Sequence, residues 1–217
     1  MIRTHAVNGA LLVLALAARP AAAQWTIEAF GGSSVSLPTP LTFHQGGLPD
    51  ISLTAHYETR AWHSAPYYAW RIGHWRGNSA WMFEFIHHKV YLEDPPAGVQ
   101  HFEVSHGYNL FVITRAWRKG RHTILTLGAG PIIGHPESEV RGRKFPEDGR
   151  GIFSDGYFFG GGTVVGGLGQ WHSLTKDVFV SAETKLSASY ARLPIQDGHA
   201  VVPNVAAHFH LGVGLEL

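Results

Sequence analysis

The sequence predicts an antiparallel, up-and-down β-barrel of eight strands that crosses a membrane. Three observations carry this prediction. Apolar and polar residues alternate with a period of two over many segments, as they do in strands with two different faces. The connections between these segments alternate between short and long. Several segments also set an apolar face against one that carries charges, and an outward apolar face is typical of a membrane barrel.

Composition favours β-structure and excludes several classes of protein. Hydrophobic residues make up 45% of the 217 residues and charged residues 15%, so the chain is not of the disordered type. The 26 glycines and 12% aromatic residues suit packed strands better than a helical bundle. The absence of cysteine excludes disulfides, thiolate metal sites and cysteine nucleophiles. A formal net charge of +1 gives no electrostatic case for binding nucleic acid.

The first 23 residues have the features of a secretory signal peptide. Arg3 supplies the basic flank, residues 10–18 form a short apolar run, and small residues end the segment at Ala23. The apolar run is too short for a transmembrane helix. We therefore expect cleavage after Ala23, which leaves residues 24–217 as the barrel domain.

The expected strands cover residues 25–32, 51–75, 81–91, 101–117, 123–133, 157–170, 178–190 and 205–217. The segment 51–75 contains Pro66, which predicts a bend or bulge around residues 63–66. Counted as one bent strand, it makes eight strands in all. Counted as two, it makes nine, an odd number that closed single-chain bacterial barrels avoid.

The connections predict which end of the barrel each loop occupies. Residues 76–79, 118–121 and 172–176 are short connections, whereas 38–50, 93–100, 134–155 and 194–202 are long and polar. Strict alternation places all the tight turns at one end, as in transmembrane barrels with short periplasmic turns.

The apolar faces are expected to point outward to lipid. The clearest are Tyr68 with Trp70 and Ile72, Trp81 with Phe83 and Phe85, Tyr108 with Leu110 and Val112, and the outer face of residues 205–217. The alternative is a soluble sandwich or barrel in which these faces form the core.

Charged and histidine side chains gather on the predicted inward faces. An eight-stranded barrel has room inside for side chains but not for an open pore, and buried charges must be paired. We therefore predict a charge network that fills the lumen, with Glu183 and Lys185 beside the inward residues of the last strand. Its expected members are Glu28, Arg71, Glu84, Glu103, Arg115, Glu183, Lys185, His208, His210 and Glu216.

The signal peptide, the alternating loops and the final strand with Gly212-x-Gly214-x-Glu216 resemble small Gram-negative outer-membrane β-barrel proteins. Many of these end in Phe, whereas this chain ends in Leu217. The resemblance implies a location in the cell outer membrane, contact with its lipids and insertion by the barrel-assembly machinery.

Catalytic and metal sites have little support in the sequence. Some barrels of this size are lipid A 3-O-deacylases with a His-x-Ser-Asn motif on a late strand, but no histidine stands two residues before Ser187 or Ser189. Ser105 and His106 are adjacent, so they are expected to point to opposite faces. His208 and His210 share a face and could bind zinc or copper with a third ligand, but no motif supplies one. We therefore predict no metal site and no cofactor.

The loop 134–155 carries both acidic and basic residues, and its basic groups could meet lipopolysaccharide phosphates. The sequence as a whole predicts a non-enzymatic envelope barrel with a structural role or with binding through its loops. The alternatives are a lipid A-modifying acyl hydrolase and a narrow channel or small-ligand carrier.

Overall fold

The computed structural model describes residues 24–146, 150–152 and 155–217. The predicted signal peptide lies outside the described residues. Within them, no helix has the length and apolar character needed to cross a membrane.

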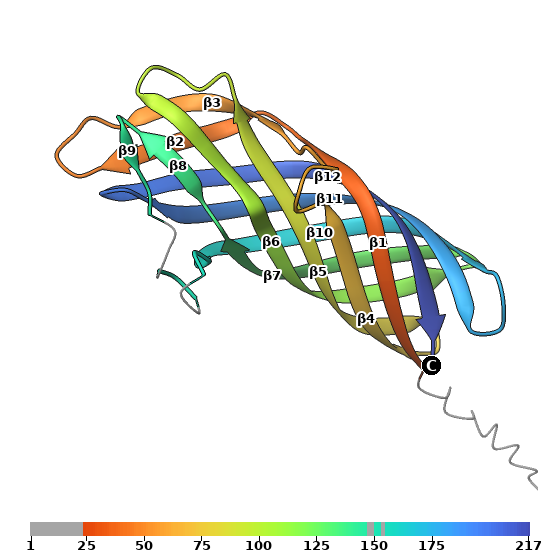
Figure 1. The fold of residues 1–217 in the computed structure, drawn as a ribbon. Coiled ribbons are helices and arrows are strands. Elements are labelled where there is room, and N and C mark those ends of the chain that lie inside the picture. Colours follow the sequence, from red (N-terminus) through yellow and green to blue (C-terminus); the bar gives the residue numbers. More distant parts are fainter. Residues whose placement is uncertain (1–23, 147–149, 153–154) are drawn as a thin grey trace, which may run out of the picture.

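Eight strand positions form a closed antiparallel ring, which confirms the predicted fold (Figure 1). The ring closes because β1 pairs with both β12 and β4. Its strands are β1 (Gln24–Ser36), β4 (Tyr68–Arg76), β5 (Ser79–Glu93), β6 (Val99–Lys119), β7 (Thr123–Gly134), β10 (Phe158–Ser173), β11 (Val178–Ile195) and β12 (Gly198–Glu216).

Two further strands extend the ring at one end. After β1, the chain continues along β12 as β2 (Thr39–Gln45), so the expected loop 38–50 is wrong over this stretch. β3 (Ile51–Glu58) pairs with β2 and β5, and β4 pairs with β5 further along. The expected strand 51–75 is therefore one ring position interrupted at residues 59–67, where Pro66 lies. This interruption confirms the count of eight.

The barrel has two different ends. The turn end carries the connections at residues 77–78, 120–122 and 174–177 and lies next to the C-terminus (Figure 1). The loop end is the opposite end, where β2, β3, β8 (Glu137–Val140) and β9 (Arg143–Lys144) lie.

The expected long loop 194–202 is wrong, because strand pairing continues through it. β11 and β12 pair as far as Ile195 and Gly198, which leaves residues 196–197 as a tight hairpin. Asp197 has a φ of 61°, the left-handed conformation that two-residue hairpins use. The expected loop 93–100 is shortened to residues 94–98 for another reason: the end of β5 pairs with β3 and the start of β6 pairs with β8.

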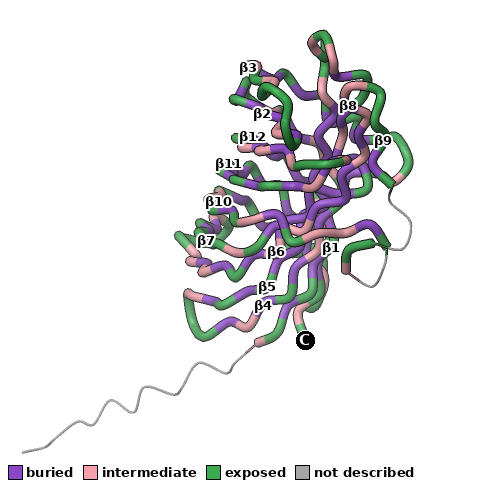
Figure 2. Tube along the Cα trace, turned by 90° about the vertical axis from the view of Figure 1, so that its left-hand side faces the viewer, coloured by how far each residue is buried: buried purple, intermediate pink, exposed green. Residues whose placement is uncertain are grey.

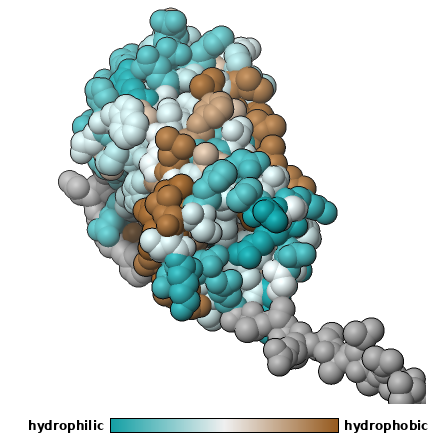
Figure 3. Space-filling model, turned by 90° about the vertical axis from the view of Figure 1, so that its right-hand side faces the viewer, coloured by the Kyte–Doolittle hydropathy of each residue, from teal (hydrophilic) through white to brown (hydrophobic). Residues whose placement is uncertain are grey.

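Burial alternates along the strands, as Figure 2 shows. On β12, Phe209 and Leu211 are exposed on the outside, and His208 and His210 are buried inside. Hydrophobic side chains gather in an oblique band between hydrophilic regions on the face drawn in Figure 3. Tyr68 and Ile72 on β4 and Trp81 and Phe83 on β5 are exposed as well, so the apolar faces of β4, β5 and β12 point outward, as predicted.

The faces of β6 are the reverse of the prediction. Tyr108, Leu110 and Val112 are fully buried inside the barrel, whereas Ile113 is 54% exposed outside. Residues 110–113 are apolar on both faces, so alternation alone does not distinguish them. The decisive factor is that the interior near the loop end is an apolar core, which these three side chains help to fill.

Candidate functional site

A lumen ion cluster of five buried charged side chains lies at mid-height in the barrel: Glu28, Arg71, Glu84, Glu183 and Lys185. Strand pairing explains part of it, because Glu28 and Glu84 are the cross-strand neighbours of Arg71 on β1 and β5. Arg71 Nε and Nη2 donate to Glu28 at 2.8 and 2.7 Å. Arg71 Nη1 and Nη2 donate to Glu183, which lies across the lumen on β11, at 3.1 and 2.7 Å.

Lys185 completes the lumen ion cluster. Its Nζ donates to Glu84 on β5 and lies 3.1 Å from Glu183 Oε2. β5 and β11 are four positions apart in the ring of eight, so this ion pair spans the barrel. Both cations of the lumen ion cluster thus have at least two carboxylate partners, as burial of charge requires.

A histidine layer lies next to the ion cluster. His210 and His208 are the cross-strand partners of Glu183 and Lys185. The Tyr67 hydroxyl lies 2.8 Å from His208 Nδ1 and 2.7 Å from His210 Nε2. Tyr67 comes from the interruption at residues 59–67 and is not among the predicted site residues. The only signal for it in the sequence is an aromatic residue directly after Pro66.

Three residues of the predicted charge network lie elsewhere, so their inclusion is wrong. Glu103 is at the loop end, 3.1 Å from His101, and Glu216 is at the turn end, where Gln24 and Arg118 donate to it. Arg115 points outward: it donates to Ser79 at 2.6 Å, and its guanidinium lies 5.2 Å from the centre of the Trp81 ring. Long cationic side chains near a strand end can extend to the polar boundary in this way.

The interior is filled in layers along the barrel axis. An apolar cluster that includes Trp75, Trp171 and Phe179 lies at the turn end. The lumen ion cluster and the histidine layer come next, and the larger apolar core extends toward the loop end. Side chains that pack and bond across the barrel therefore fill it at successive heights.

A second group of polar side chains, the rim cluster, lies at the loop end: Ser105, His106, His135 and Glu137. A bulge positions it, because residues 105–107 of β6 face only Lys89 of β5. Ser105 Oγ donates to Glu137 Oε1 at 2.6 Å, and His106 Nδ1 lies 2.7 Å from the same oxygen. The expectation that Ser105 and His106 point to opposite faces is wrong, because the bulge breaks the alternation.

The rim cluster does not have the geometry of a nucleophilic triad. In a triad, the serine and the acid bond to different nitrogens of the histidine. Here Ser105 Oγ and Glu137 Oε1 both approach Nδ1 of His106, at 3.3 and 2.7 Å. Burial raises the pKa of Glu137, but hydrogen bonds from Ser105 and His106 outweigh burial and leave the pKa below its usual value. Glu137 is therefore an anion that two neighbours already bind.

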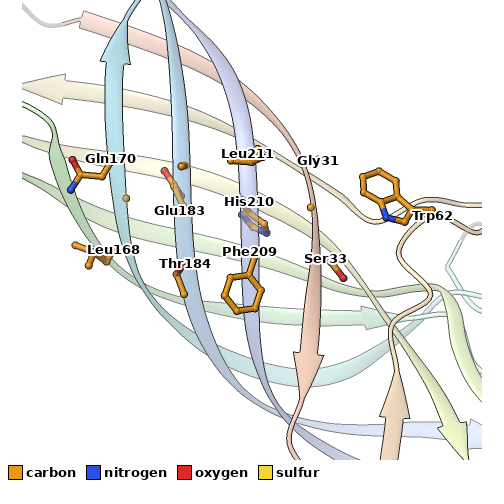
Figure 4. A pocket seen from close by; sticks show the side chains of 13 residues that line it. Gly31, Ser33, Trp62, Leu168, Gln170, Glu183, Thr184, Phe209, His210 and Leu211 are labelled. Atoms are coloured by element: carbon orange, nitrogen blue, oxygen red, sulfur yellow. The ribbon is translucent and has the colours of Figure 1, made fainter.

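A groove of 740 Å³ lies on the outer surface of β1 and β10 to β12 (Figure 4). Its walls include Leu168, Phe209 and Leu211, and Trp62 from the interruption at residues 59–67 stands beside it. The groove is mostly apolar and does not contain the rim cluster.

No family model matches the sequence, and no curated protein matches it. The outer membrane protein AlkL, solved in lipid bilayers, has a similar structure, with a TM-score of 0.50 and 10% identity over 100% of this chain and 97% of AlkL. OprG from Pseudomonas aeruginosa has a TM-score of 0.46 and 7% identity, over 91% of this chain and 97% of OprG. Ail of Yersinia pestis has a TM-score of 0.44 and 10% identity, over 89% of this chain and 98% of Ail. The predicted resemblance is thus confirmed for the fold: the chain is an eight-stranded antiparallel barrel like those of small Gram-negative outer-membrane proteins.

Proposed function

We propose that this protein is a non-conducting barrel of the outer membrane that acts through its loop end, in a structural or binding role. The observation that carries the proposal is the lumen ion cluster. Arg71 on β4 donates to Glu183 on β11, and Lys185 on β11 donates to Glu84 on β5, so these ion pairs join β11 to two strands across the barrel. An ion crossing the lumen would have to break these buried ion pairs. Each buried charge left without its partner costs several kcal/mol.

The outer surface supports the location in a membrane. Large apolar side chains are exposed on the outside of β10, β11 and β12, including Leu168, Leu186 and Leu211 at 52%, 62% and 72%. Exposure of many apolar side chains on adjacent strands marks an interaction surface, and a continuous apolar outer face suits lipid. Outer-membrane lipids are then the partners of this surface, lipopolysaccharide meets the charged loop end, and the barrel-assembly machinery inserts the chain.

Catalysis has weaker support than binding. Two serine–histidine pairs, Ser187 with His208 and Ser34 with His88, are buried inside the barrel, where no acyl chain has access. At the loop end, His106 is exposed but Ser105 is buried, and the two lack the geometry of a triad. We therefore expect the composition of lipid A to be the same in cells with and without the protein, as measured by mass spectrometry.

Single-channel recording in planar bilayers tests the proposal. The folded protein should give no stepwise conductance under conditions in which a general porin gives steps, because the interior is filled and paired. Heat-modifiable migration on a gel and recovery in the outer-membrane fraction establish that the protein is folded and inserted. Regular conductance steps from inserted protein would contradict the closed lumen, and recovery in the periplasm would contradict the location.

A further inference from the structure

We propose that His106, His135 and Glu137 of the rim cluster bind a divalent transition-metal ion, with zinc as the best fit. Each of the three side chains offers one ligand atom, and these atoms all lie within 4.8 Å of one another. The ligand atoms of a tetrahedral zinc site stand about 3.3 Å apart, given zinc–nitrogen bonds of about 2.0 Å. Small side-chain rotations are therefore enough to close the three ligands around one ion.

The backbone holds the three ligands in place. The bulge at residues 105–107 turns His106 toward Glu137, and the His135 N–H donates to the Gly107 carbonyl at 3.1 Å. His135 is a buried residue whose ring centre lies 5.1 Å from that of His106 and 4.9 Å from that of Tyr157. The ligands thus come from two segments that backbone hydrogen bonding already joins.

Outer-shell contacts of the kind found around metal sites are also present. Ser105 Oγ donates to Glu137 Oε1 at 2.6 Å, and the Tyr157 hydroxyl donates to the carbonyl of His106 at 3.2 Å. Partners of this kind orient the ligands of metal sites and contribute to their affinity.

The charge around the site favours a cation. Glu103 on β6 stands directly opposite Glu137 on β8 in the strand pairing, and like charges in that position destabilise a sheet. His101, Glu103 and Glu137 form a second group whose ligand atoms lie within 4.8 Å of one another. A metal ion on Glu137 would reduce the repulsion between the two carboxylates.

The donor set selects the class of ion. Two imidazoles and one carboxylate suit zinc and its neighbours in the first transition row, whereas calcium and magnesium prefer oxygen ligands. The side chain of His106 is 53% exposed, so an ion can reach the site from the loop end. Three protein ligands leave a fourth position for water or for a donor group from outside the protein.

The ion cluster inside the barrel is a poorer candidate. Glu84, Glu183 and His210 also bring ligand atoms within 4.8 Å of one another. Arg71 and Lys185 already form ion pairs with both of these carboxylates, so a metal ion would have to displace buried cations. The proposal therefore concerns the rim cluster alone, and it does not depend on whether the lumen conducts.

Titration with zinc chloride, followed by calorimetry, tests the proposal on the folded, chelator-treated full chain in detergent. We expect one zinc ion to bind tightly to each protein molecule, and excess calcium or magnesium should not displace it. Mutating residues that only support the ligands of a metal site lowers metal affinity about 10- to 100-fold. The double variant H106A/H135A removes two ligands themselves, so it should bind zinc about 100-fold more weakly or worse. Glu137→Gln keeps the shape of the side chain but removes its charge, and should weaken binding by about tenfold or more.

The matched control is H122A/H172A, which removes two stacked, exposed histidines at the turn end, 4.8 Å apart. This variant should still bind one zinc ion tightly. Heat-modifiable migration on a gel shows whether each variant is folded. Tight binding that survives in folded H106A/H135A or folded Glu137→Gln would overturn the proposal. The proposal would also be overturned if H122A/H172A lost tight zinc binding, or if the unsubstituted protein bound no zinc tightly.

Discussion

Arg71 and Glu183 are 112 positions apart in the sequence, yet two hydrogen bonds of 2.7 and 3.1 Å join their side chains across the lumen. Both side chains are almost completely buried. The guanidinium also binds Glu28 through two hydrogen bonds, so Arg71 links β1, β4 and β11 at one height in the barrel. This arrangement is the basis of the first two predictions.

Replacing Glu183 by alanine should destabilise the barrel by about 3 kcal/mol or more, because Arg71 and Lys185 each lose a buried anionic partner. The free energy of unfolding in urea, measured in detergent or vesicles, gives the size of the effect. The control is Arg143→Ala, which removes a half-exposed ion pair with Asp197 at the loop end and should change stability by less than about 0.5 kcal/mol. Equal effects of the two substitutions would mean that water reaches the lumen ion cluster freely.

Glu84 and Lys185 should show strong coupling in a double-mutant cycle. Lys185→Met alone leaves the Glu84 carboxylate without its lysine, and Glu84→Leu alone leaves Lys185 with Glu183 as its remaining partner. The double variant removes both charges and should be destabilised by several kcal/mol less than the sum of the two single variants. Additive unfolding free energies would show that the two side chains do not form a buried pair.

Trp75 and Trp81 should report which face of the barrel meets lipid. They lie near the turn end on paired strands, where Trp75 stands opposite Ala80, but Trp75 is 1% exposed and Trp81 59%. In variants that retain only one of the seven tryptophans, brominated lipid should quench the fluorescence of Trp81 and leave that of Trp75 nearly unchanged. The reverse pattern, or equal quenching, would contradict the assignment of the outer face.

Gly107 should be required for the bulge that forms the rim cluster. Its φ of 126° is one that other residues rarely adopt, and a Cβ there would lie 2.2 Å from the side chain of Asn109. Gly107→Ala should therefore lower the free energy of unfolding by about 1–3 kcal/mol. Gly166→Ala is the control, since a Cβ there meets nothing closer than 3.9 Å and the change should be close to neutral. Equal stability of both variants would show that the bulge tolerates a side chain.

The sequence by itself was sufficient for the ring of eight strands and for the faces of several of them. On β11 and β12, one face is apolar and the other is polar or small, and side chains in a strand point alternately to the two faces. That local rule assigns Glu183 and Lys185 to the same face, and the structure places both in the lumen. Local alternation also assigns Arg71 and Glu84 to inward faces, where strand pairing makes them neighbours.

Only the tertiary structure decided the features that depend on contacts between distant segments. The faces of β6 could not be predicted, because residues 110–113 are apolar on both faces and the surrounding core selects the face that turns inward. Tyr67 reaches the histidine layer through an interruption whose path no local pattern specifies. The rim cluster depends on a bulge, and a bulge is set by how two strands pair. Alternation is a property of one strand, whereas register, bulges and the filling of the interior depend on the strands beside it and across the barrel.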